Sequence, residues 1–304
     1  MSVPARDAAT VILVRDGSDD QGEPCIEVCM LRRNLAAEFS AGAYVFPGGS
    51  VDEEDRGPAA AALCRGRTDA EASAILGIDS GGLAFWVAAL RECFEEAGVM
   101  LAGTLDGTPP DRYSPLDTGD PGVARRFAAH RRALNEGRTG LAQVCEQENL
   151  MLAADRVHYV SHWITPQLSP KRYDTRFFIT AAPPGQVAEH DAGETIATVW
   201  VRPQAALAAG VDAEVDLLPP TLANLRNIES FRSTDEVMAW ARQVTDVPTV
   251  LPVVLFEDGH LLVLRPGDAG YEEAVADLEA SGETPDEELA AAARHIWGPK
   301  ADRG

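Results

Sequence analysis

The sequence predicts an α/β protein in which a mixed β-sheet is sandwiched between α-helices. Short apolar segments with strand character alternate with longer segments of helical periodicity along the 304 residues. One apolar segment ends in a glycine pair, Gly48-Gly49, and a long apolar helical pattern starts at residue 83. Strands interleaved with helices in this way are typical of a sheet covered by helical layers.

Three strands and two helices are predicted before residue 100. The strands are 8–15, 25–31 and 43–46, each an apolar or alternating run bounded by turn residues. The helices are 69–76 and 83–97, and Gly98 stops the second one. Residues 103–122 are polar and contain several prolines, and no regular element is predicted there.

Helices and strands continue to alternate after residue 122. Helical patterns cover 123–136, 141–150, 220–231 and 234–245, and strand patterns cover 158–163, 173–181 and 195–201. A hairpin is predicted over 250–256 and 260–264, because turn residues separate two apolar runs. We therefore expect a main domain over 7–245 and a C-terminal extension over 246–304, which consists of the hairpin and an exposed acidic tail.

The composition argues against several classes of partner. A formal net charge of −22 opposes binding to nucleic acid or to an anionic membrane, since both require a cationic surface. The sequence has no run of 18 apolar residues and no secretory signal, so we expect a cytoplasmic protein without a membrane segment. Five cysteines show neither a disulfide pattern nor a zinc-site spacing.

The segment 91–99 places three carboxylates on one helix. Residues three and four apart share a helical face, so Glu92, Glu95 and Glu96 are expected to project side by side. Like charges four apart cost a helix about 0.2–0.5 kcal/mol, and a hard divalent cation such as Mg²⁺ or Mn²⁺ relieves this repulsion. The alternative is a solvated acidic face with no ligand.

The same segment, together with Gly49, resembles the signature of the Nudix hydrolases. That signature is a glycine, five residues, a glutamate, seven residues and then R-E-U-x-E-E-x-G-U, where U is apolar. Two features differ here: Asp55 stands at the first glutamate position, and 35 residues instead of seven separate it from Arg91, an excess of 28. The interrupting segment, 56–83, is expected to be a surface insertion that can act as a lid.

An interrupted signature resembles the Nudix branch that includes the peroxisomal coenzyme A diphosphatase of animals and its bacterial relatives. The resemblance covers about 7–245, with specific matches at 163–166, 172–178 and 217–221. It implies the Nudix fold. By analogy with the family, a homodimer is one expected assembly.

The resemblance implies roles for the residues of the signature. Glu92, Glu95, Glu96 and Asp55 would hold Mg²⁺ or Mn²⁺, with Glu95 and Glu96 central to catalysis. Arg91 is expected to orient a carboxylate through a salt bridge, and Gly48, Gly49 and Gly98 are expected to shape the loop and the helix end. A downstream general base is also implied, and either Glu189 or Glu194 could supply it.

The substrate is less well defined by the sequence. Arg33, Gly42 and Phe46 match a pattern found in coenzyme A diphosphatases of another Nudix branch, whereas Asn34 and Glu38 depart from it. We expect Arg33, Phe46, Arg172 and Arg176 to bind substrate. The rival cations lie in the run 125–132, which is more typical of a solvated helix face.

The resulting hypothesis is metal-dependent hydrolysis of a diphosphate linkage in a small nucleotide derivative. Coenzyme A or its acyl esters would give adenosine 3′,5′-bisphosphate and (acyl-)phosphopantetheine. A dinucleotide substrate such as NADH or ADP-ribose is the alternative within the enzyme class. A Nudix module that binds a ligand without turnover is the alternative outside it.

Overall fold

The computed structural model describes residues 3–34, 42–106, 112–167, 169, 171–191, 193–211, 215–257 and 260–281. Within these ranges, an eight-stranded mixed sheet has the order β10-β2-β1-β9-β8-β11, with β3 beside β2 and β4 beside β1. Its strands are β1 (Arg6–Ser18), β2 (Pro24–Arg33), β3 (Tyr44–Val45), β4 (Gly48–Ser50), β8 (His158–Ile164), β9 (Tyr173–Ala181), β10 (Thr195–Val201) and β11 (Thr249–Val250).

Strand β1 is the centre of the sheet. It runs parallel to β9 from Arg6 to Val14 and antiparallel to β2. Its apolar run is buried on both faces, as expected for a central strand covered by helices on each side. Val11 and Leu13 belong to one hydrophobic core, and Ile12 and Val14 belong to the other, as the two-residue period of a strand requires.

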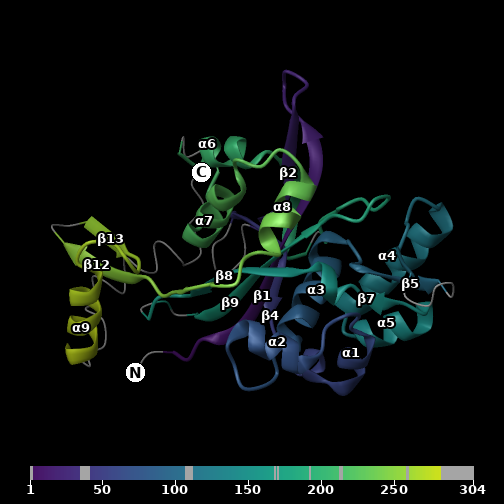
Figure 1. The fold of residues 1–304 in the computed structure, drawn as a ribbon, viewed down its shortest axis with the longest axis horizontal. Coiled ribbons are helices and arrows are strands. Elements are labelled where there is room, and N and C mark those ends of the chain that lie inside the picture. Colours follow the sequence, from purple (N-terminus) through teal and green to yellow (C-terminus); the bar gives the residue numbers. More distant parts are fainter. Residues whose placement is uncertain are drawn as a thin grey trace.

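Helices cover both faces of this sheet (Figure 1). The first core contains side chains from α1 (Pro58–Leu63), α2 (Asp69–Leu76), α3 (Leu83–Ala97), α4 (Pro121–Asn135) and α5 (Leu141–Glu148). The second contains side chains from α6 (Pro203–Val211), α7 (Pro219–Ile228) and α8 (Thr234–Ala241). The sandwich predicted from the sequence is therefore confirmed.

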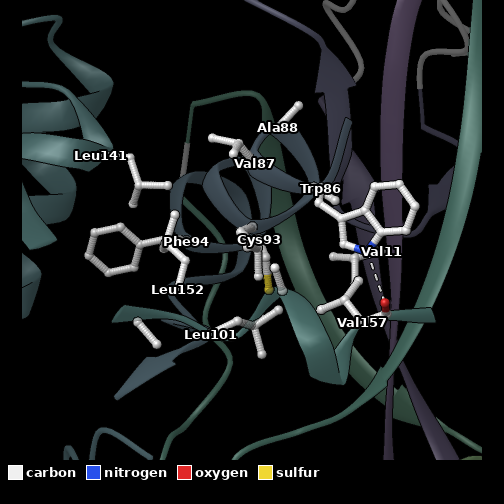
Figure 2. Close-up of a cluster of buried hydrophobic side chains, with 14 of the residues drawn as sticks. Val11, Trp86, Val87, Ala88, Cys93, Phe94, Leu101, Leu141, Leu152 and Val157 are labelled. Carbon is white, nitrogen blue, oxygen red and sulfur yellow. Dashed lines mark hydrogen bonds between the residues drawn. The ribbon is translucent and has the colours of Figure 1, made fainter. Parts of the chain in front are cut away.

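Helix α3 is buried around most of its circumference. Figure 2 shows Trp86 beside Val11 and Val157, and Phe94 on the side of Leu141. The indole Nε1 of Trp86 donates to the carbonyl of Val157 at 2.9 Å, which satisfies its only polar atom. A helix that is apolar on nearly every side packs between other elements, and this fixes the position of its acidic last turns.

The structure contains elements that the sequence pattern did not predict. Among them are helices α1 and α6 and a small sheet of β5 (Ala102–Asp106), β6 (Arg112–Pro115) and β7 (Met151–Leu152). Strands β5 and β6 lie in the polar stretch 103–122, for which no element was predicted. They form because tertiary pairing with each other and with β7 outweighs a composition typical of loops.

The predicted extension is attached to the sheet by β11, which pairs in parallel with β8. The hairpin is present as β12 (Val253–Glu257) and β13 (His260–Leu264), followed by α9 (Tyr271–Ser281). The tail was expected to be exposed, but Tyr271 and Ala274 are buried against the hairpin, and Tyr271 Oη donates to the Leu251 carbonyl at 2.8 Å. The tail beyond residue 281 lies outside the described residues.

Several predicted elements have the expected bounds, namely α2, β9 and β10. None of the described helices is long and apolar enough to cross a membrane.

Candidate active site

The glycine pair brings the β4 backbone against the acidic face of α3. The Gly48 amide donates to Oε2 of Glu96 at 2.9 Å. A Cβ atom on Gly49 would lie 2.4 Å from Oε1 of Glu92, so a larger residue there would displace that carboxylate. At the other end, Gly98 closes α3 with a φ of +69°, a conformation that favours glycine. Each of these three glycines thus fits a position where little or no side chain is tolerated.

Arg91 is a buried hub that links the loop to the carboxylates. Its Nη1 donates to Glu92 at 2.9 Å and to Glu95 at 2.8 Å, and its Nη2 donates to the Ser50 carbonyl at 2.8 Å. The predicted salt bridge between Arg91 and Glu95 is therefore present, one helical turn apart. Because the guanidinium is planar with a fixed set of donors, it holds these groups in defined directions.

Asp55 contacts Arg91 from the opposite side. Its carboxylate accepts from Arg91 Nε at 3.0 Å and Nη2 at 2.9 Å, and it also accepts from the Asp52 amide at 2.8 Å. Asp55 is 4% exposed, although 35 residues separate it from Arg91 along the chain. Both of its oxygens are engaged in these contacts, so the structure places Asp55 as a support for Arg91 and the loop.

The environment of α3 disfavours ionised carboxylates. Burial raises the pKa of Glu92 to about 7, although Arg91 opposes the shift. Burial, and then the neighbouring Glu92, raise the pKa of Glu96 well above its usual value. Burial also raises the pKa of Glu95, against the effect of Arg91. One arginine therefore compensates these acids only in part, and a further cation would stabilise their charged forms.

These residues fit a hard divalent cation by their chemistry. They offer carboxylate oxygens, which Mg²⁺ and Mn²⁺ prefer, in a buried environment where arginine compensates only part of the negative charge. Among the described side chains, however, no three acidic, imidazole or thiol groups converge into a ready-made metal cluster. Arg91 and the Gly48 amide instead hold Glu92, Glu95 and Glu96.

Helix α4 fixes the end of α3. Arg131 donates from Nε to the Glu95 carbonyl at 2.9 Å and from Nη2 to the Glu96 carbonyl at 2.7 Å. Asn135 also donates to the Glu95 carbonyl. The run 125–132 was expected to be a solvated face, which is wrong for Arg131. An arginine near a helix terminus is a frequent capping group, but the sequence could not show which helix it would cap.

A cavity of about 510 Å³ opens beside the acidic face of α3. Its charged wall comes from α3, β2 and the loops and contains Arg33, Asp52, Arg91, Glu92, Glu95 and Glu194. Its apolar wall contains Phe46, Trp163, Ile164, Pro166, Phe177, Leu218, Pro219, Pro220, Pro252 and Val263. Pockets of this size, in which apolar side chains and convergent polar groups line one space, are typical of small-molecule sites.

Arg33 lines the charged wall and Phe46 the apolar wall of this cavity, and their binding of substrate stays a prediction. The Arg33 Nε atom is buried and has no hydrogen-bond partner among the described residues. Such a donor is costly to leave unpaired and suits an anionic ligand. Glu38, which replaces the second arginine of the coenzyme A pattern, lies outside the described residues.

Arg172 and Arg176 do not reach this cavity. Alternate residues of β9 point to opposite faces, so Tyr173, Thr175 and Phe177 line the cavity while Arg176 packs over the Phe85 ring, 4.7 Å from its centroid. Arg172 donates instead to the Thr165 and Val3 carbonyls. The expectation that both arginines bind substrate is therefore not supported by their positions.

The two candidate bases lie in different places. A second cavity, of about 840 Å³, shares Glu92, Glu95 and Glu194 with the first and is also lined by Glu96 and Glu189. Glu194 therefore borders both cavities, whereas Glu189 borders only the second. The Glu194 amide donates to Asp191 at 3.0 Å and its carbonyl accepts from the Asn34 amide at 2.9 Å, so its backbone is held at the rim.

The insertion at 56–83 lines neither cavity. Its helices α1 and α2 contribute to the core around α3, and Arg65 forms an ion pair with Asp155 at 2.6 Å. In this arrangement the insertion packs against α3 and does not cover either cavity, so it does not act as the lid that the sequence allowed.

Comparison with known proteins agrees with this architecture. The sequence-family model described as the NUDT19 Nudix domain matches residues 78–228. The acyl-coenzyme A diphosphatase NUDT19 of Homo sapiens is 27% identical over 281 residues, covering 82% of this chain and 73% of its own. The protein of the same name from Gallus gallus is also 27% identical, covering 91% of this chain and 82% of its own.

A solved structure shares the fold. The crystal structure of a Nudix hydrolase from Alicyclobacillus acidocaldarius superposes with a TM-score of 0.61 at 24% identity, covering 78% of this chain and 96% of that one. The residues that match the Nudix signature are those that form the site. They supply the glycine loop, the buried Arg91 and the carboxylates of α3. This chain belongs to the Nudix hydrolase superfamily, in the NUDT19 branch, and is a pyrophosphohydrolase.

Proposed function

We propose that this enzyme hydrolyses the diphosphate linkage of coenzyme A or an acyl-coenzyme A. The products would be adenosine 3′,5′-bisphosphate and phosphopantetheine or its acyl ester. The observation that carries this proposal is a single cavity whose walls include both the acidic face of α3 and an apolar surface. The names of the relatives from Homo sapiens and Gallus gallus support the same substrate class.

The charged wall suits the diphosphate. A Mg²⁺ or Mn²⁺ ion held by Glu92, Glu95 and Glu96 would neutralise phosphate oxygens and lower the pKa of the attacking water. Arg33, with its unpaired Nε, would bind a phosphate oxygen directly. Arg91 would act indirectly, since its contacts orient Glu92 and Glu95.

A general base must lie where the water is activated. Glu194 borders both cavities together with Glu92 and Glu95, and its exposed carboxylate can accept a proton. We therefore prefer Glu194 to Glu189 as the base. The cytoplasmic location and the homodimer remain predictions from the sequence.

The test is a product analysis with purified protein and Mg²⁺ or Mn²⁺. The substrates are coenzyme A, acyl-coenzyme A esters, NADH and ADP-ribose, and products are separated by chromatography. Adenosine 3′,5′-bisphosphate from the coenzyme A compounds, with little turnover of the others, is the expected result. Preferential release of AMP from NADH or ADP-ribose would overturn the proposed substrate and favour a dinucleotide.

A further inference from the structure

The apolar wall of the cavity includes residues of the C-terminal extension. Pro252 precedes β12 and Val263 lies within β13, and both line the cavity with Trp163, Phe177 and Leu218. Figure 1 shows this hairpin well separated from α3, so the cavity extends from the acidic helix to the extension. The hairpin therefore supplies the part of the wall that is remote from the carboxylates.

The pairing of the hairpin explains why Val263 faces the cavity. Val263 lies opposite Val254 in the antiparallel pair, so these two side chains share a face. Val253 and Leu264, the adjacent pair, face the other way and pack with Tyr271 and Ala274 of α9. Strand alternation thus divides the hairpin into one face that packs on α9 and another that contacts the cavity.

The hairpin is held firmly enough to act as a wall. Strand β11 pairs with β8 just before it, and the Tyr271 hydroxyl bonds to the Leu251 carbonyl. Val254, which lies opposite Val263, is 2% exposed, so the shared face is covered at that position. These contacts hold the hairpin, and with it Val263, in place at the cavity wall.

The charge distribution decides which part of the substrate meets this wall. Among the described lining residues, the cations are Arg33 and Arg91, and Arg91 is already bound by Asp55, Glu92 and Glu95. The adenosine half of coenzyme A carries an additional phosphate, which a wall without cations would not stabilise. The uncharged pantetheine arm and an acyl chain suit an apolar wall.

We propose that the hairpin of the C-terminal extension forms the acyl-chain subsite, with Val263 as a residue that determines the accepted chain length. This inference rests on the proposed function and adds to it the direction in which the substrate lies. The diphosphate would lie at the charged wall, and the acyl chain would run toward Pro252 and Val263.

The experiment measures kcat/KM for coenzyme A and its acetyl, octanoyl and dodecanoyl esters. Each methylene buried against the wall is worth roughly fourfold in affinity, so the wild-type enzyme should prefer the longer chains. Val263→Trp should lower the ratio of dodecanoyl to unesterified coenzyme A turnover by about tenfold or more, since one Trp displaces several methylenes. Its effect on coenzyme A itself should be smaller than its effect on the dodecanoyl ester, because the unesterified substrate carries no acyl chain to reach Val263.

Leu262→Trp is the matched control. Leu262 is adjacent on the same strand but 41% exposed and does not line the cavity, so its variant should keep the wild-type profile. Val263→Ala provides a smaller change that preserves folding and should move the preference toward longer chains. Thermal unfolding of each variant verifies that it is folded.

Three outcomes would overturn the inference. In the first, Val263→Trp changes kcat/KM for all four substrates by the same factor. In the second, Leu262→Trp shows the same profile as Val263→Trp. In the third, kcat/KM of the wild-type enzyme does not depend on chain length. In each case, cleavage of coenzyme A by the wild-type enzyme would leave the proposed function standing. A wild-type enzyme that does not cleave coenzyme A at all would overturn both.

Discussion

Arg91 and Asp55 form a buried ion pair, with Arg91 Nη2 donating to Oδ2 of Asp55 at 2.9 Å. Burial by itself lowers the pKa of Arg91, but the hydrogen bond that Arg91 donates to Asp55 and the charge of Glu92 raise it above the ordinary value. The pair therefore keeps the guanidinium charged while it holds two carboxylates of α3. The insertion separates these two residues of the signature in the sequence, yet they are in direct contact in the folded protein.

The first prediction concerns this pair. Asp55→Asn keeps the shape of the side chain but removes the charge that faces Arg91. Groups that orient metal ligands are typically worth about 10–100-fold in metal affinity or activity, and we expect a loss of this size. The measurement is Mn²⁺ affinity by calorimetry together with kcat/KM. Wild-type values for both would show that Asp55 only fills space.

The second prediction concerns the carboxylates themselves. Glu96→Gln retains an acceptor for the Gly48 amide, and Glu95→Gln retains one for Arg91, so both variants should remain folded. A catalytic cation contributes several kcal/mol, so loss of either carboxylate should lower kcat by about 100-fold or more. Glu146→Gln, at an exposed position of α5, is the control for charge alone. Unchanged turnover in both variants would contradict the assignment of the site.

A third prediction distinguishes the two candidate bases. Glu194 borders both cavities, whereas Glu189 borders only the second. General acid–base groups contribute about 10²–10⁴-fold, so Glu194→Gln should lower kcat by such a factor. Glu189→Gln removes the same charge nearby and should behave like the wild-type enzyme. If the two results are reversed, Glu189 is the base.

The fourth prediction is a pH dependence of stability in metal-free protein. The pKa of Glu92 is about 7 in the folded protein, above the usual carboxyl value. A raised folded-state pKa stabilises the protein below the unfolded-state pKa, and that stability is lost as the pH rises through the folded-state pKa. We therefore expect the free energy of unfolding in EDTA to fall between about pH 4.5 and 7, by on the order of 3 kcal/mol.

Denaturant unfolding at several pH values, in EDTA and in Mn²⁺, measures this effect. A bound cation favours the ionised carboxylates, so Mn²⁺ should stabilise the protein most at the upper end of the range. Glu92→Gln removes the titrating group and should flatten the EDTA slope. A wild-type slope that the substitution leaves unchanged would mean that other groups cause it.

Local sequence periodicity predicted the elements and much of the charged site. The bounds of α2, β9 and β10 followed from their patterns, and helical spacing placed Glu92, Glu95 and Glu96 on neighbouring positions. Gly48 and Gly49 were expected at a close backbone approach, and the structure puts them against Glu96 and Glu92. These features depend on residues a few positions apart, where local geometry is nearly fixed.

Features that depend on distant segments were decided only by the tertiary structure. The role of Asp55 required a loop to return across an insertion, and the pairing of β5 and β6 required partners that their composition does not reveal. Arg172 and Arg176 looked suitable for phosphate, but strand alternation and nearby carbonyl groups turned them away from the cavity. Likewise, the hairpin was visible in the sequence, whereas its contact with the cavity was not.

The sequence by itself determined the chemistry available to this protein: a helix with three carboxylates, an arginine one turn before the second of them, and a glycine pair to receive them. The tertiary structure decided which charges meet and which surface faces the substrate. The physical reason is that periodicity acts over one or two turns, while burial and ion pairing depend on segments brought together from the whole chain.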